Sequence, residues 1–198
     1  MNKAKNELGF EASIEAHLLG NDWVSVPAGA YDARLGVVPS ELVEFLKVSQ
    51  PDEWEQFVLR VGGGNDAKAA DKVVAYVAGQ IDERGTLHVL RNETRMNGVA
   101  FRCAFFAPAN SLVPELRERY QANRLGVARQ VHFSVKDAGL SLDTVLFING
   151  LPVATVELKN PLTGQTVEHA MRQYRYGRDP AELIFRNRAV VHFAADTE

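Results

Sequence analysis

Apolar residues are spaced as in helices over the first half of the chain and as in strands over much of the second half. In residues 8–19, Phe10, Ile14 and Leu18 recur at intervals of four, which predicts an amphipathic helix. Similar patterns predict helices at 39–47, 51–61, 66–83, 112–123 and 166–177. Strand-like runs of apolar and β-branched residues occupy 86–92, 98–106, 127–135, 143–148, 152–159 and 189–194.

This order of elements is typical of an α/β (α+β) fold with a mixed central β-sheet flanked by helices. At 198 residues the chain has the length of a single domain. We expect residues 1–105 to form its helix-rich part and residues 106–198 to form the core that carries the chemistry. Only residues 195–198 follow the last predicted strand, so we expect the chain to be a fragment of a longer protein.

The composition argues against a membrane-spanning protein and against a disulfide-stabilised one. Hydrophobic residues make up 46% of the chain and charged residues 24%, as in ordinary globular domains. No apolar run reaches the roughly 18 residues that a membrane-spanning helix needs, and the N-terminus lacks the apolar core of a signal peptide. The single cysteine, Cys103, lies in an apolar stretch and is expected to be a buried thiol. We therefore expect a cytoplasmic protein.

Charge is unevenly distributed along the chain, whose formal net charge is −3. Residues 1–101 contain 10 Lys/Arg and 15 Asp/Glu, whereas residues 102–188 contain 12 and 8. The second part therefore permits local contacts with phosphates. An ordinary mixed surface explains the same split equally well.

The most informative stretch is residues 142–159, where two β-rich runs flank Asn149-Gly150, a strong hairpin signal. Side chains two apart in a strand share a face, so Glu157 and Lys159 project from one side of the second strand. Whether Asp143 joins them depends on the register. A two-residue loop would place Asp143 opposite Val156, whereas a three-residue loop or an equivalent bulge would place it opposite Glu157, on the same face.

Two carboxylates and a lysine on one face suit a hard divalent cation, Mg²⁺ or its substitute Mn²⁺. The candidate ligands are the side chains of Asp143 and Glu157 and the backbone carbonyl of Leu158, because Mg²⁺ prefers oxygen ligands. Such an ion polarises a phosphate and helps to generate hydroxide, and Lys159 is suited to hold the attacking water or a phosphate oxygen. The alternative is a hairpin in which Glu157 and Lys159 form a solvated pair at a sheet edge.

The surrounding sequence is similar to a known family. Residues 143–161, with Val-Leu-Phe-Ile-Asn-Gly-Leu-Pro ahead of Glu-Leu-Lys-Asn-Pro, closely resemble the N-terminal nuclease region of the R (restriction) subunits of type I restriction-modification enzymes. That family belongs to the PD-(D/E)xK nuclease superfamily. The resemblance spans roughly residues 10–196, and it includes the segments 106–112, 120–124, 162–165, 173–180 and 191–193.

The resemblance implies a Mg²⁺-dependent endonuclease that hydrolyses phosphodiester bonds of double-stranded DNA. Such an enzyme works in a complex with modification (methyltransferase) and specificity subunits. Cleavage follows ATP-driven translocation by motor domains that lie outside this chain, so ATP would act only through those domains.

The resemblance also assigns residues. Asp143, Glu157 and Lys159 carry over as the catalytic set, with Gln173 on the following helix and Tyr176 as its aromatic partner. Many relatives have Gln-x-x-x-Tyr, whereas Gln173 and Tyr176 are three apart. An acid on the first helix completes the superfamily's set, for which Glu11 is the better match and Glu15 the alternate.

The geometry of an α-helix adds two expectations for residues 166–177. Ala170, Gln173 and Tyr176 would share one face, from which Gln173 would reach the site. Three arginines would form an adjacent basic stripe that contacts DNA phosphates, or else an ordinary exposed helix surface; they are Arg172, Arg175 and Arg178.

Other sites are not supported. Residues 62–68, Gly-Gly-Gly-Asn-Asp-Ala-Lys, lack the Gly-Lys-Ser/Thr of a phosphate-binding loop, and the five histidines show no metal-ligand spacing. Two alternatives to the restriction enzyme remain. One is a repair or recombination nuclease of the same superfamily, and the other is a catalytically silent DNA-binding or assembly module. The intact set of Asp143, Glu157 and Lys159 argues against the silent module.

Overall fold

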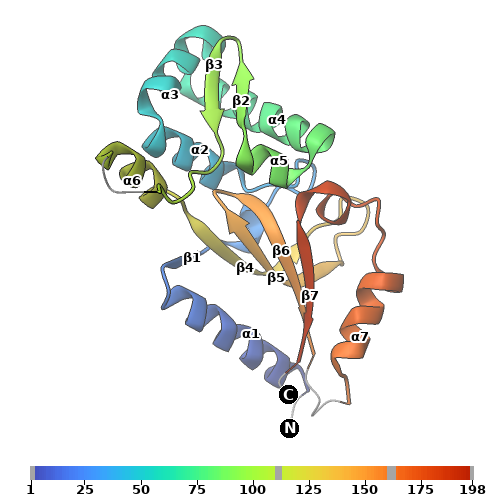
Figure 1. Ribbon diagram of the computed structural model, residues 1–198. Helices are drawn as coiled ribbons and strands as arrows, with labels where there is room; N and C mark the ends of the chain where they lie inside the picture. The colour runs from blue at the N-terminus through green and yellow to red at the C-terminus, as the bar shows by residue number, and fades with distance from the viewer. Residues whose placement is uncertain (1–2, 110–112, 160–163, 197–198) are drawn as a thin grey trace.

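The computed structural model describes residues 3–109, 113–159 and 164–196, and it has two lobes (Figure 1). The helical lobe contains α2 (Pro39–Ser49), α3 (Pro51–Phe57), the π-helical η2 (Val58–Gly62), α4 (Asp66–Arg84), α5 (Thr86–Arg91), and the hairpin of β2 (Glu93–Met96) and β3 (Val99–Arg102). Beside this lobe lies α6 (Pro114–Gln121).

The second lobe is built on a five-stranded sheet. It contains α1 (Lys3–Leu19), β1 (Trp23–Ser25), the 3₁₀ turn η1 (Ala28–Ala30), β4 (Leu125–His132), β5 (Ser141–Ile148), β6 (Leu151–Leu158), α7 (Val167–Arg172), the π-helical η4 (Gln173–Gly177) and η5 (Ile184–Arg188), and β7 (Val191–Ala195). The strand order is β1-β4-β5-β6-β7. Because β1–β4 and β6–β7 are parallel while the central pairs are antiparallel, the sheet is mixed. The predicted fold class is confirmed.

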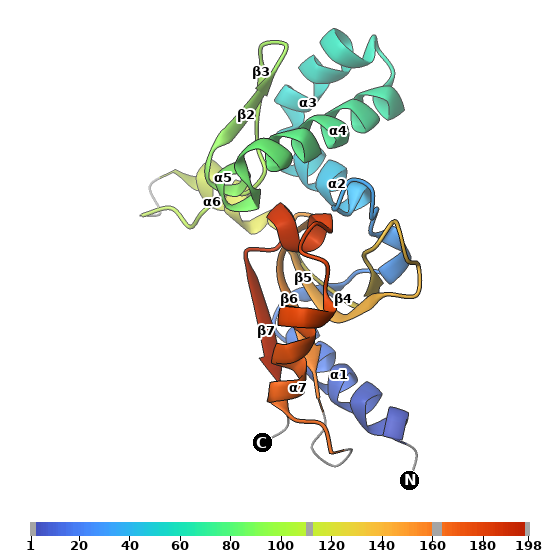
Figure 2. The same cartoon turned by 90° about the vertical axis from the view of Figure 1, so that its right-hand side faces the viewer.

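Two helices position side chains around this sheet. α1 contacts β1, β4 and β6, and α7 contacts β6 and β7. Figure 2 shows α7 running alongside β7, with α1 at the same end of the sheet lobe. The sheet lobe therefore takes in residues 3–25 from the helix-rich part of the sequence as well as the strands after residue 124.

Two local predictions are wrong for identifiable reasons. Residues 86–92 form α5 rather than a strand, because Thr86, Val89 and Leu90 are buried at the i, i+3, i+4 spacing of a helix. The predicted helix 166–177 is α-helical only to Arg172 and continues as the π-helical η4. The short strands β1 and β2 were not predicted, because three or four residues give too little periodicity to detect.

The structure has two hydrophobic clusters, one mainly in the helical lobe and one mainly in the sheet lobe. The core of the helical lobe includes Phe45, Phe57 and Ile81, and it also buries Cys103 completely, as predicted. The core of the sheet lobe includes Val131 and Phe147. Within the residues that the structure describes, no helix is long and apolar enough to cross a membrane.

The β5–β6 hairpin has the bulge that the sequence argument required. Next to the turn, Ile148 pairs with Leu151 and Phe147 with Pro152, as in a two-residue loop. Beyond a register shift, Leu146 pairs with Ala154 and Thr144 with Val156. Val153 is the extra residue, and it moves the register by one. Continued by one pair, this register places Asp143 across from Glu157.

The turn itself is anchored to the rest of the molecule. Asn149 and Gly150 both have positive φ, 52° and 79°, and Asn149 is fully buried. Its Nδ2 donates to the carbonyl of Cys103 (2.9 Å), and its Oδ1 accepts from the backbone N–H of Arg124 (2.7 Å). The carbonyl of Gly150 accepts from the N–H of Val38 (2.8 Å) just before α2. These bonds connect the hairpin to the helical lobe.

Replacing Gly150 tests this anchor, because a Cβ there would lie 2.4 Å from the carbonyl oxygen of Val38 and 2.9 Å from the N atom of Leu42. Gly98 in the β2–β3 turn has the same φ of 79°, but its Cβ would meet only the end of the Arg60 side chain at 3.2 Å. Gly98→Ala should therefore cost only the backbone strain, about 1 kcal/mol. Gly150→Ala adds backbone overlap and should cost roughly 1–3 kcal/mol more in unfolding free energy. Equal losses in urea denaturation would contradict the proposed packing.

Candidate active site

Asp143 and Glu157 come together on one face of the β5–β6 hairpin. Asp143 Oδ2 accepts a hydrogen bond from the backbone N–H of Leu158 (2.7 Å), which holds its carboxylate across the strand pair. Glu157 is 1% exposed. The two carboxylates are close enough for the charge of Asp143 to raise the pKa of Glu157. The bulge at Val153 thus produces the alignment on which the proposed site depends.

Both oxygens of the Glu157 carboxylate have donors from the segment after α7. Gln173 Nε2 donates to Oε2 (3.0 Å), and Arg178 forms an ion pair with Oε1. Burial, followed by repulsion from Asp143, raises the pKa of Glu157 to about 7, against the opposing effects of Arg178 and Lys159. The negative charge of the buried Glu157 carboxylate is therefore only partly compensated by Arg178 and Lys159.

A third carboxylate reaches the site from the first helix. Glu11 of α1 is 3% exposed, and Gln130 Nε2 bridges it to Asp143, at 2.9 Å from Glu11 Oε1 and 3.5 Å from Asp143 Oδ1. Burial raises the pKa of Glu11, and the charge of Asp143 adds to this rise. Glu15, the alternate first-helix acid, contacts Arg129 and Ser25 and, in the part of the chain that the structure describes, forms no hydrogen bond with Asp143 or Glu157.

Gln130 is held in an unusual conformation. Its φ is +51°, in the left-handed region that residues other than glycine rarely adopt. It lies between the pairs Arg129–Thr144 and Val131–Leu142, and therefore across from Asp143. Strain of this kind costs of order 1–3 kcal/mol and tends to occur at functional sites.

The remaining predicted members of the site lie at the end of β6. Lys159 follows the strand, its N–H donates to the carbonyl of Ala195 (2.9 Å), and its charge lowers the pKa of Glu157. Within the described residues, no ion pair engages the Lys159 ammonium. Leu158 is 2% exposed and contributes its N–H to Asp143.

The donor set fits a hard divalent cation. Burial and the nearby charge of Asp143 raise the pKa of Glu157 and of Glu11, and an added positive charge would favour the ionised form of both carboxylates. The described residues contain no group of three acidic, histidine or cysteine side chains arranged to enclose a metal ion. Asp143 and Glu157 offer two neighbouring carboxylates, which suit an ion that takes few protein ligands and completes its shell with water and substrate oxygens, as Mg²⁺ commonly does.

The structure gives Tyr176 a different place from the predicted one. Its side chain is 83% exposed, whereas Tyr174 packs on Phe185 and His192 and lies 2.8 Å from the Thr155 hydroxyl. The prediction assumed a regular α-helix, but a π-helical turn bonds i to i+5 and rotates the following side chains. The aromatic residue beside this face of the sheet is therefore Tyr174.

The three arginines of the predicted basic stripe do not share one exposed surface. Arg172 and Arg175 are exposed, as a phosphate-contacting surface requires. Arg178 is not part of that surface, because its side chain is only 6% exposed and bonds Glu157. Here too the α-helical spacing was the wrong assumption.

Sequence reasoning did not identify Gln130, Tyr174 or the role of Arg178. Gln130 is one of several polar residues in the predicted strand 127–135, so its position in the sequence did not distinguish it. His192, on the neighbouring strand, lies 2.7 Å from the hydroxyl of Thr155, and burial lowers its pKa. No spacing rule connects these residues, because they lie on different elements.

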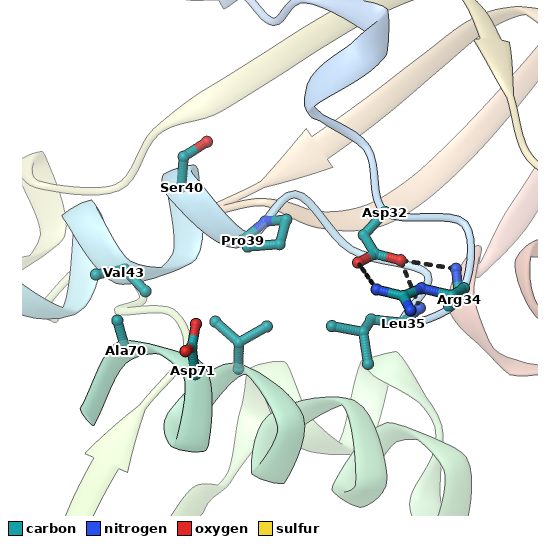
Figure 3. Close-up of a pocket in the computed structure, with 9 residues that line it drawn as sticks. Asp32, Arg34, Leu35, Pro39, Ser40, Val43, Ala70 and Asp71 are labelled. Atoms are coloured by element: carbon teal, nitrogen blue, oxygen red, sulfur yellow. Dashed lines mark hydrogen bonds and ion pairs between the residues drawn. The ribbon is translucent and has the colours of Figure 1, made fainter. Parts of the chain in front are cut away.

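Two other pockets are less suitable candidates for the active site. Figure 3 shows a pocket of about 440 Å³ between α2, α4 and the loop that begins at Asp32. The Asp32 carboxylate is used locally, since it accepts from the N–H groups of Arg34 (2.8 Å) and Leu35 (3.2 Å). A second pocket of about 990 Å³ lies over the opposite sheet face, and its lining, which includes Phe106 and Val191, is mainly apolar.

A mixed sheet flanked by helices, with carboxylates on two adjacent strands and a lysine directly after the second strand, is consistent with a nuclease-like core. The family model described as Type I restriction enzyme R protein N terminus matches residues 116–194. This match confirms the resemblance over the segment that contains Asp143, Glu157 and Lys159, and it supports a restriction nuclease domain. It covers less of the chain than the resemblance inferred from the sequence. No curated protein and no solved structure matches the chain.

The raised pKa of Glu157 predicts a pH-dependent effect of Glu157→Gln. Between about pH 4.5 and 7, folded Glu157 keeps a proton that the unfolded chain has released, so its contribution to stability falls as the pH rises. Glutamine does not titrate. In EDTA, the stability of the variant relative to wild type should therefore rise across this interval, by up to about 3 kcal/mol. Urea denaturation at pH 5 and pH 8 measures this change.

The matched control is Glu168→Gln, which removes the same charge from an exposed position on α7. Its stability relative to wild type should stay constant between the two pH values. If Glu157→Gln shows the same constant difference, Glu157 is not the group whose protonation is coupled to folding.

Proposed function

We propose that this chain is the DNA-cleaving part of a type I restriction enzyme R subunit and that it hydrolyses phosphodiester bonds with Mg²⁺. The observation that carries the proposal is the alignment of Asp143 with Glu157 beside Lys159, inside the segment that matches the family. Deoxyribonuclease activity requires such a charge-stabilising site next to the scissile phosphate.

Asp143 and Glu157 would hold the metal ion, with the backbone carbonyl of Leu158 as a third ligand and Mn²⁺ as a substitute ion. The bound ion would polarise the phosphate and lower the pKa of a water molecule. Affinity should be modest, because two carboxylates leave several positions to water and phosphate.

The protein's own groups would position the reactants. The Lys159 ammonium, beside the carboxylates and without an ion-pair partner among the described residues, would hold the attacking water or a phosphate oxygen. Gln173 would orient Glu157 through its 3.0 Å hydrogen bond. Glu11, linked to Asp143 through Gln130, would add negative charge that favours retention of the cation.

DNA and partner subunits complete the proposed function. The exposed Arg172 and Arg175 follow the site along the chain and would contact backbone phosphates. Modification and specificity subunits would select the DNA, and motor domains outside this chain would use ATP to deliver it. Cleavage and DNA selection would then depend on different polypeptides or domains.

Substitutions at the site separate catalysis from folding. Glu157→Gln and Lys159→Ala should each lower Mg²⁺-dependent plasmid nicking by roughly 100-fold or more, with cooperative thermal unfolding retained. Leu158→Asp should instead unfold the domain, because it buries an unpaired charge at a position that is 2% exposed. Nicking assays and thermal melting on the same preparations measure both properties.

Glu168→Gln, on the exposed surface of α7, is the matched charge control and should cleave like wild type. The assignment of Glu157 as a metal ligand is wrong if Glu157→Gln stays folded and cleaves at the wild-type rate. Loss of folding in that variant would instead favour a structural role for this strand.

A further inference from the structure

Arg178 is held inside the protein beside the proposed metal ligands. Its side chain is 6% exposed, its guanidinium lies 5.2 Å from the centre of the Phe133 ring, and its Nη2 donates to the carbonyl of Ser141 at 2.8 Å. The same Nη2 bonds Glu157 Oε1. Contacts from β5, β6 and the Phe133 ring thus fix an arginine that the sequence pattern placed on an exposed helix.

The π-helical turn brings Arg178 and Gln173 to the same carboxylate. The two residues are five apart, which places them on nearly opposite sides of an α-helix. A π-helical turn spaces its hydrogen bonds five residues apart, so residues at this separation can share a side. As a result, Gln173 takes one oxygen of Glu157 and Arg178 takes the other.

The arrangement is not optimal for stability. Arg178 Nε is buried without a hydrogen-bond partner in the described structure, and a buried donor without an acceptor costs about 1–3 kcal/mol. Arginine also prefers to bind carboxylates through two parallel bonds, whereas here one nitrogen serves both Glu157 and Ser141. A purely structural ion pair would be expected to satisfy its donors better.

We propose that Arg178 is a built-in counter-cation for Glu157 that competes with the divalent cation for this carboxylate. In the absence of metal, the guanidinium compensates the buried charge and holds Glu157 in place. When the ion binds, it shares or displaces that contact, while Ser141 and Phe133 keep Arg178 nearby. Arg178 is therefore a positioning residue that sets metal affinity, and this inference rests on the proposed metal-dependent function.

The test is Mn²⁺ binding to the metal-free chain, followed by electron paramagnetic resonance. Arg178→Gln removes a positive charge next to the site and should tighten Mn²⁺ binding by at least about tenfold. Arg178→Lys keeps the charge and should bind close to wild type. Arg186→Gln, which loses an exposed arginine from η5, controls for net charge and should also bind like wild type.

If Arg178 only supported the fold, Arg178→Gln should change the Mn²⁺ affinity in the opposite direction, because loss of the arginine would disorder Glu157 and weaken the binding of Mn²⁺. If wild type binds Mn²⁺ and Arg178→Gln binds it no more tightly, the competition is overturned while the metal site stands. If neither protein binds Mn²⁺, the proposed metal site fails, and the inference fails with it.

A measurement on wild type covers the case in which Arg178→Gln does not fold. The side-chain Nε–H resonance of Arg178 should shift as diamagnetic Mg²⁺ is added, because the guanidinium loses or shares its carboxylate partner. The shift should saturate with the same dissociation constant as Mg²⁺ binding measured by calorimetry. Saturated Mg²⁺ binding without any change in this resonance would overturn the competition.

Discussion

The register of the β5–β6 hairpin is the constraint on which the site depends. A shift of one residue moves every side chain of a strand to the other face of the sheet. Near the turn the pairing is that of a two-residue loop, and the extra residue Val153 changes it before the strands reach Asp143 and Glu157. Without that bulge, Asp143 would face Val156, and its carboxylate would not meet that of Glu157.

The turn that sets this register also joins the lobes. Asn149 binds backbone groups at Cys103 and Arg124, and Gly150 binds Val38 just before α2. The helical lobe therefore does more than cover the sheet. Its hydrogen bonds fix the position of the Asn149-Gly150 turn, where the pairing of β5 with β6 begins. A second clamp is the buried Arg188, which bonds the carbonyl of Leu35 (2.9 Å) and the carboxylate of Asp82 (2.8 Å).

The fixed register brings acidic side chains together at buried positions, where an uncompensated charge is costly. Glu157 and Glu11 are almost fully buried, and proximity to Asp143 raises the pKa of both. Further local costs come from the left-handed Gln130, from the π-helical turn and from Arg178 Nε, which has no hydrogen-bond partner among the described residues. Conformations that carry such costs persist only when the surrounding structure holds them in place. Their concentration around one carboxylate pair is expected of a site that must accept a cation and a phosphate.

The mixed α+β architecture, the Asn149-Gly150 turn and the trio of Asp143, Glu157 and Lys159 could all be predicted from the sequence alone, because periodicity, turn preference and residue type are properties of short segments. The sequence left the register open between two alternatives. Three features became apparent only in the folded chain: the position of the bulge, the contact of Glu11 with Asp143 through Gln130, and the π-helical turn that buries Arg178 and exposes Tyr176. These outcomes depend on packing between elements far apart in the chain, which no local pattern records.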